Sequence, residues 1–152
     1  MAIEELVREY SNMLFRICMV MLGNEQDAQD VVQETFCRYL ERSESFKDSG
    51  HEKAWLIKVA TNGCRDIHRH RIRHPSANID DITAYCEMPE QSEIVLSLIG
   101  LPDKFKVVIY LHYIEGYKSA EIAGMLGIST EAVKKRLQRG REALRLSIKR
   151  QT

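Results

Sequence analysis

Apolar residues recur at helical spacing along almost the whole chain. Within residues 2–22 they fall on every third or fourth position, which predicts a first helix. Its apolar stripe consists of Ile3, Leu6, Val7, Tyr10, Met13, Leu14, Ile17, Cys18 and Met21. Gly23 ends this helix, and Asn24 is placed to cap a second one. The inner face of that second helix is predicted to be Ala28, Val32, Thr35, Phe36 and Tyr39.

A third helix is predicted from about residue 52 to residue 73, after a polar loop over residues 43–50. Pro75 ends it, because the residue before a proline is pushed out of the helical region. Its predicted inner stripe is Leu56, Val59, Ala60, Gly63 and Ile67.

Residues 75–92 lack a helical period and contain two of the three prolines. They carry Asp80, Asp81, Glu87 and Glu90 and no Lys or Arg, which indicates a flexible acidic linker. Helical patterning resumes from Ile94, and Pro102 suits the first position of a further helix. No alternating run predicts a sheet. We therefore expect an all-α fold with two small helical domains, 1–74 and 93–152, joined by the linker 75–92.

The segment from Ser119 to Arg141 has the spacing of a helix-turn-helix. Ala123 lies four residues before Gly127, and Val133 lies six residues after it. A small residue lets two helices cross closely, a glycine serves the tight turn, and a β-branched residue anchors the second helix. Ile122, Leu126 and Ile128 complete the expected core, and Ser129 is placed to cap the second helix.

The outer face of that second helix is predicted to meet a DNA major groove. Val133, Leu137 and Leu144 share its inner face, so polar side chains project from the other side. From Lys134 to Arg150 there are eight basic residues and one acidic residue. A solvated basic helix is the alternative, but such a helix rarely comes with this spacing.

The third helix has a basic face of its own, opposite its apolar stripe. Lys58, Asn62, Arg65 and Arg69 follow one another at spacings of four, three and four. Such a row suits phosphate contacts with some reading of base edges, although a solvated charged face fits equally well. His68, His70 and His74 suggest a metal site only weakly, because arginines surround them and cysteine partners are missing. No metal or other cofactor is expected.

Asp27, Asp30, Glu34 and Glu41 are predicted to fall together on the outer side of the second helix. A solvated face explains this, and so does a docking face for a basic protein surface.

The four cysteines are read as buried hydrophobic residues in a reducing cytosol, since they form no CxxC pair. They are Cys18, Cys37, Cys64 and Cys86. The N-terminus has no signal-peptide pattern, and the apolar run at residues 17–22 is too short to span a bilayer, so we expect no direct membrane insertion.

Three blocks of sequence, in this order, resemble the extracytoplasmic-function (ECF) branch of the bacterial RNA polymerase sigma factors. Residues 27–36 (DAQDVVQETF) resemble the family's polymerase-docking helix. Residues 55–62 (WLIKVATN), with Asp66 and Arg69, are similar to its promoter-melting helix. The third block runs from Leu101-Pro102 through Glu121-Ile122-Ala123 to Arg139-Gly140-Arg141.

The resemblance implies a transcription initiation factor that works in the cytoplasm, with core RNA polymerase and promoter DNA as partners and an anti-sigma factor as a further expected partner. It implies polymerase binding through Asp27, Asp30, Gln33 and Glu34. It implies minus-ten promoter contacts by Phe46, Lys47, Lys58, Asn62, Arg65 and Arg69, with Phe46 as a wall of a pocket for a flipped base. It implies minus-thirty-five contacts by Thr130, Glu131, Lys134, Lys135, Gln138 and Arg139.

Some positions depart from the family pattern: Lys118, Lys106 where the family commonly has Arg, and Glu131-Ala132 where it usually has Gly-Thr. The family usually has Ser where this chain has Lys118, and a lysine cannot accept the capping bond. The helix is therefore expected to start late, at Ser119, or to lose about 1 kcal/mol of capping energy. Glu131 places an acid beside the expected DNA contacts.

Net charge alone argues against DNA binding, because 22 basic residues balance 22 acidic ones among 152. The charges are segregated, however. Residues 75–100 hold five acidic groups and no basic ones, whereas residues 101–152 hold eleven basic and five acidic. Neutrality is thus the sum of an acidic linker and a basic domain.

Two rival functions stay open: a free-standing helix-turn-helix regulator, and a helical adaptor whose charged faces meet only proteins. An enzymatic role and a small-molecule substrate are not expected, since no nucleophile–base motif, phosphate-binding loop or metal-ligand cluster is present in the sequence.

Overall fold

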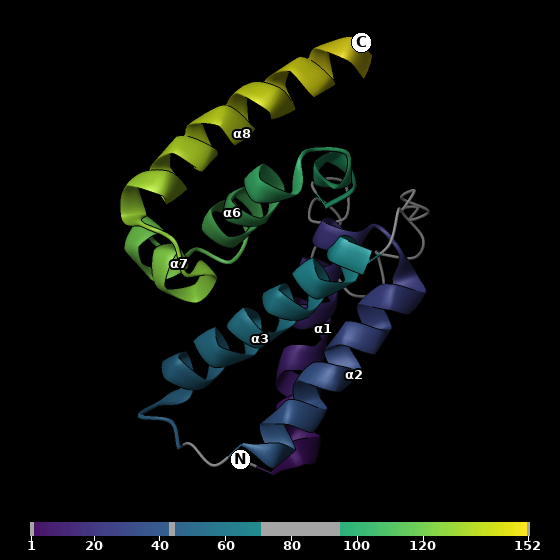
Figure 1. The fold of residues 1–152 in the computed structure, drawn as a ribbon, viewed down its shortest axis with the longest axis vertical. Coiled ribbons are helices and arrows are strands. Elements are labelled where there is room, and N and C mark those ends of the chain that lie inside the picture. The colour runs from purple at the N-terminus through teal and green to yellow at the C-terminus, as the bar shows by residue number, and fades with distance from the viewer. Residues whose placement is uncertain (1, 43–44, 71–94, 152) are drawn as a thin grey trace.

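The first three helices pack as one unit in the computed structural model, which describes residues 2–42, 45–70 and 95–151 (Figure 1). α1 spans Ile3–Leu22, α2 spans Glu25–Glu41 and α3 spans Ser49–His70. Each of the three contacts the other two. The linker expected at 75–92 and the end predicted for the third helix near residue 73 lie outside the described residues.

The connection between α1 and α2 is built as the sequence predicts. Gly23 takes a left-handed conformation with φ of 63°, and its N–H donates to the carbonyl of Met19. The side chain of Asn24 then accepts a 2.9 Å hydrogen bond from the backbone N–H of Asp27 and caps α2. A left-handed residue followed directly by a capping residue reverses the chain in two positions.

More of the surface of α1 is buried than the predicted apolar stripe. Every residue from Met13 to Leu22 is buried, including Arg16. α3 also has a second buried face, formed by Ile57, Thr61 and Cys64 in addition to Leu56 and Ala60. Both observations have one cause: α1 and α3 pack against the remaining helices as well as against α2.

The second unit consists of a helical segment at residues 95–99 and three further helices. These are α6 (Asp103–Tyr113), α7 (Ser119–Leu126) and α8 (Thr130–Gln151). Pro102 is the N-cap of α6 rather than its first residue. α6 contacts α1 and α7 contacts α3, and the long α8 extends beyond them (Figure 1).

The architecture confirms the predicted all-α fold with two small domains. The described residues contain no strand. Within them, no helix combines the length and apolar content that crossing a bilayer requires.

Candidate nucleic-acid and polymerase interfaces

α7 and α8 form a helix-turn-helix around the residues that the sequence singles out. Gly127 adopts φ of 69° at the end of α7, and the N–H of Ile128 donates to the carbonyl of Ala123 at 3.1 Å. Ile122, Val133 and Leu137 are buried between the helices. Because the turn and core are both in place, the orientation of α8 is fixed with respect to α7.

The start of α8 is capped as predicted. The Ser129 hydroxyl accepts a 3.1 Å hydrogen bond from the backbone N–H of Ala132. Of the predicted minus-thirty-five contacts, Thr130 is half-buried and the other five are exposed. The exposed five are Glu131, Lys134, Lys135, Gln138 and Arg139. They form one polar face that is open to solvent.

The start of α7 shows the consequence of the lysine at position 118. Lys118 occupies the N-cap, and its backbone N–H donates to the Glu121 carboxylate at 2.9 Å. A lysine side chain has no acceptor, so the reciprocal bond of a full capping box is not made. The helix thus begins at Ser119 with half of the box.

The basic face of α3 lies where the sequence places it, but it borders the second domain. Lys58, Asn62 and Arg69 are exposed, and Arg65 is half-buried. Burial, and then the charges of Arg136 and Arg69, lower the pKa of Arg65. The Asp66 carboxylate lies 3.8 Å from Arg69 on the same helix. The face is therefore a row of cations that the fold brings close to a further cation on α8.

Phe46 lies in an aromatic cluster rather than on open surface, while the neighbouring Lys47 is exposed. The Phe46 ring stacks on Tyr39 at 6.0 Å between centroids and meets Trp55 edge-on at 5.7 Å. The Tyr39 hydroxyl donates to the buried Glu52 carboxylate at 2.8 Å, which fixes this cluster to α3. Phe46 is thus held by its neighbours, half-buried, at the start of α3.

The acidic face of α2 is smaller than predicted. Asp30, Gln33 and Glu34 are exposed, as expected. The placement of Asp27 on the outer side is wrong, because its side chain is buried. It lies in the first turn of α2, where Asn24 caps the helix, and this turn packs inward.

The cysteine prediction is correct for Cys18 and Cys64, which are buried free thiols, and wrong for Cys37, which is exposed on α2. Cys86 and His74 lie outside the described residues. His68 is not placed as a ligand: its Nε2 lies 2.6 Å from the Met21 carbonyl and 3.2 Å from the Asp103 carboxylate. The described residues hold no cluster of three or more His, Cys, Asp or Glu side chains suited to a metal.

Sequence reasoning missed a polar network between the two domains, built on Arg16, Lys53, Tyr110 and Glu115. Arg16 Nε donates to the Tyr110 hydroxyl at 2.9 Å, and Arg16 Nη2 lies 3.2 Å from Glu115 Oε1. An arginine inside the apolar run of α1 was the available signal. Its partners lie more than 90 positions away, so no local pattern identifies them.

Comparison with known proteins gives the family. The model of Sigma-70 region 2 matches residues 6–74, and that of Sigma-70, region 4 matches residues 88–144. The ECF RNA polymerase sigma factor SigW of Bacillus subtilis (strain 168) is 32% identical, in an alignment covering 97% of this chain and 89% of SigW. SigL of Mycobacterium tuberculosis is 33% identical, over 92% of this chain and 85% of SigL.

Solved structures agree in fold. CnrH, solved in complex with the cytosolic domain of CnrY, matches with a TM-score of 0.72 and 27% identity over 99% of this chain and 89% of CnrH. The sigma factor RpoE of Bartonella quintana, solved with the anti-sigma factor NepR, matches with a TM-score of 0.76 over 96% of both chains at 20% identity. With both domain models, whole-chain relatives and the helix-turn-helix in agreement, the chain belongs to the ECF RNA polymerase sigma factors.

Proposed function

We propose that this chain is a transcription initiation factor that binds core RNA polymerase and directs it to specific promoters. The observation that carries the proposal is the division of charge between two domains of one chain. The first domain presents an acidic face on α2 and a basic face on α3, and the second presents a basic helix-turn-helix. A factor that must contact both a protein and DNA needs such separate faces.

Each face then has one role. Asp30, Gln33 and Glu34 contact the polymerase, whereas the buried Asp27 supports the helix start rather than touching the partner. α3 and the loop before it engage the minus-ten element, with residues 1–74 as that domain. α8 reads the minus-thirty-five element as duplex, with residues 93–152 as the second domain and 75–92 as the linker between them.

The roles are those of a binding protein, not an enzyme, because contact with polymerase and promoter requires no reacting group of its own. The place of action is the cytoplasm, where core polymerase and promoter DNA meet. Since CnrH was solved with the cytosolic domain of CnrY and RpoE with the anti-sigma factor NepR, we infer that this chain also has an anti-sigma partner.

The test is transcription of genomic DNA by core polymerase with and without the chain, followed by mapping of RNA 5′ ends. New start sites that share two upstream elements are expected. Asp30→Lys with Glu34→Lys should lower polymerase affinity by roughly two orders of magnitude or more, since like charges facing a basic surface cost several kcal/mol. Glu4→Lys with Glu5→Lys, on the exposed first turn of α1, makes the same charge change and should leave affinity unchanged.

Unchanged polymerase binding by the α2 double variant would show that α2 is not part of the polymerase interface. Strong, site-specific duplex binding by the chain alone, with no effect on polymerase, would instead favour the free-standing helix-turn-helix regulator.

A further inference from the structure

A groove lined by cations lies at the seam between the two domains, beside the C-terminal half of α3. Its volume is about 380 Å³, within the range of roughly 300–1,000 Å³ that small-molecule sites occupy. Four cationic side chains from three helices line it: Arg65 and Arg69 of α3, Lys104 of α6 and Arg136 of α8. The fold thus gathers around one hollow a positive charge that no single helix carries alone.

These cations have little counter-charge within the described residues. There, neither the Arg65 nor the Arg136 guanidinium forms an ion pair. Arg69 is paired with Asp66 at 3.8 Å, but both side chains are more than half exposed. Burial, and then the charges of Arg136 and Arg69, lower the pKa of Arg65. The guanidiniums therefore repel one another, and an anion bound between them relieves that repulsion.

Among the described residues that line the groove, Asp103 is the one acid, and its carboxylate is already engaged. It lies 3.0 Å from Lys106 Nζ and 3.2 Å from His68 Nε2. Lys106 is buried and also donates to the Ile99 carbonyl at 3.2 Å, which holds this pair in place. Asp103 is thus committed to other partners and leaves the four groove cations without a matching anion.

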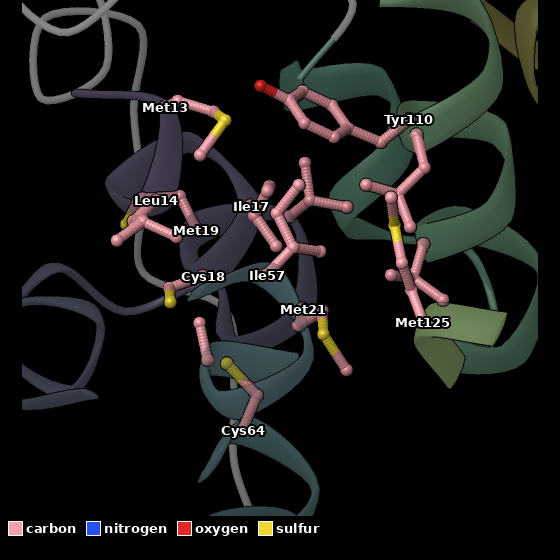
Figure 2. Packing of buried hydrophobic residues seen from close by; sticks show 14 of the residues in the cluster. Met13, Leu14, Ile17, Cys18, Met19, Met21, Ile57, Cys64, Tyr110 and Met125 are labelled. Atoms are coloured by element: carbon pink, nitrogen blue, oxygen red, sulfur yellow. The ribbon is translucent and has the colours of Figure 1, made fainter. Parts of the chain in front are cut away.

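The rest of the groove wall is apolar. Met21 of α1 lines it together with Val107 of α6 and Ile128 from the turn between α7 and α8. Met21 and Val107 belong to the core that the two domains share, part of which Figure 2 shows around Met21. An apolar wall lowers the local dielectric constant and so strengthens the attraction between a guanidinium and an anion.

We propose that this groove binds a small polyphosphate anion, a chain of linked phosphate groups held between the two domains by Arg65, Arg69, Lys104 and Arg136. A planar guanidinium pairs with phosphate through two parallel hydrogen bonds, which makes arginine well suited to this ligand. Cations that come from three helices require more than one phosphate group to satisfy them. Lys104 and Arg136 are not among the DNA or polymerase contacts proposed above, so the site does not rest on that function.

The test is isothermal titration calorimetry of the full chain with inorganic triphosphate. The buffer is free of magnesium and holds about 0.15 M salt, at which exposed charges are largely screened. Saturable one-to-one binding is expected. It should be about tenfold or more tighter than the binding of orthophosphate, because each further charge-assisted hydrogen bond adds affinity. Triphosphate should also raise the thermal unfolding temperature, since it binds the folded chain.

Arg136→Gln removes a half-buried groove cation and should weaken triphosphate binding about tenfold or more. Lys104→Gln should act in the same direction and more weakly, because this exposed ammonium contributes as a point charge. The matched control is Arg8→Gln on the exposed surface of α1, which removes the same charge outside the groove and should leave the affinity unchanged. If circular dichroism shows that Arg136→Gln loses helix, Lys104→Gln becomes the primary variant.

ATP in the same buffer distinguishes the two sources of a polyphosphate chain. Equal affinities for ATP and triphosphate would identify the phosphate chain as the whole ligand. Tighter binding of ATP would identify a nucleotide whose base lies on the apolar wall.

No saturable binding up to about 1 mM triphosphate would overturn the proposal, and so would equal losses in Arg136→Gln and Arg8→Gln. Asp80→Asn with Asp81→Asn, outside the described residues, tests whether the chain's own acids compete for the groove. A gain of about tenfold in triphosphate affinity would show that they do, and would overturn the assignment of the groove to an external ligand. None of these measurements involves polymerase or a promoter, so their outcome is independent of the proposed function.

Discussion

α3 and α8 carry similar rows of basic side chains, but only the row on α3 lies beside the other domain. α8 packs through one stripe onto α6 and α7, and its opposite face meets solvent. α3 packs against α1, α2 and α7, so its basic face borders a domain seam. A charge pattern in the sequence therefore predicts which side of a helix is polar. It does not predict whether that side can reach DNA, because this depends on how many neighbours the helix has.

The largest expected difference between the two faces is in duplex binding by the chain alone. Lys134→Ala with Lys135→Ala should weaken binding roughly ten- to a hundredfold near 0.1 M salt and flatten the salt slope by about 1.8, since each lost phosphate contact contributes about 0.9. Lys58→Ala with Arg65→Ala should change neither quantity. Fluorescence anisotropy over a salt series measures both. Equal losses in the two double variants would show that α3 is available to DNA in the free chain.

Adding a side chain at Gly140 is expected to disrupt the packing of α8 against α6. A Cβ built there would lie 2.8 Å from Ile109 Cγ1 and 3.3 Å from Phe105 Cβ, both on α6. Gly140→Ala should therefore lower the free energy of unfolding by about 1–3 kcal/mol, as overpacked cores do. Gly124→Ala on α7 meets nothing within 4 Å and should raise stability by about 0.5–1 kcal/mol. Urea unfolding distinguishes them, and a stabilising Gly140→Ala would contradict the close α6–α8 contact.

The smallest effects concern the caps of the helix-turn-helix. Ser129→Ala removes the bond to the Ala132 N–H and should cost about 1 kcal/mol. Lys118→Ser supplies the acceptor that α7 lacks and should add about 0.5–1 kcal/mol. Thermal unfolding of the two variants should shift in opposite directions. A destabilised Lys118→Ser would mean that the lysine side chain has a packing role.

Sequence alone predicts the features that depend on local chemistry. The helix end at Gly23, the Asn24 cap and the Ser129 cap were all predicted, because each satisfies backbone groups within a few positions. The outer face of α8 follows equally from its own periodicity.

The features that the sequence does not predict depend on contacts between residues that are far apart in the chain. The second buried face of α3, the burial of Arg16 and the position of Glu115 are all consequences of the domain seam. The inward placement of Asp27 and the exposure of Cys37 depend on how α2 packs, which a helical period leaves uncertain by one position. Long-range packing therefore determines which of the predicted polar helix faces are exposed to a binding partner.

The most direct test of this account is footprinting of one mapped promoter by the chain alone and by the chain bound to core polymerase. Nuclease protection reports duplex contact, and permanganate reactivity reports opened thymines. The free chain is expected to give at most weak protection of the upstream element, through α8, whereas the polymerase-bound chain should protect both elements and open the downstream one. Protection and opening of the downstream element by the free chain would contradict it.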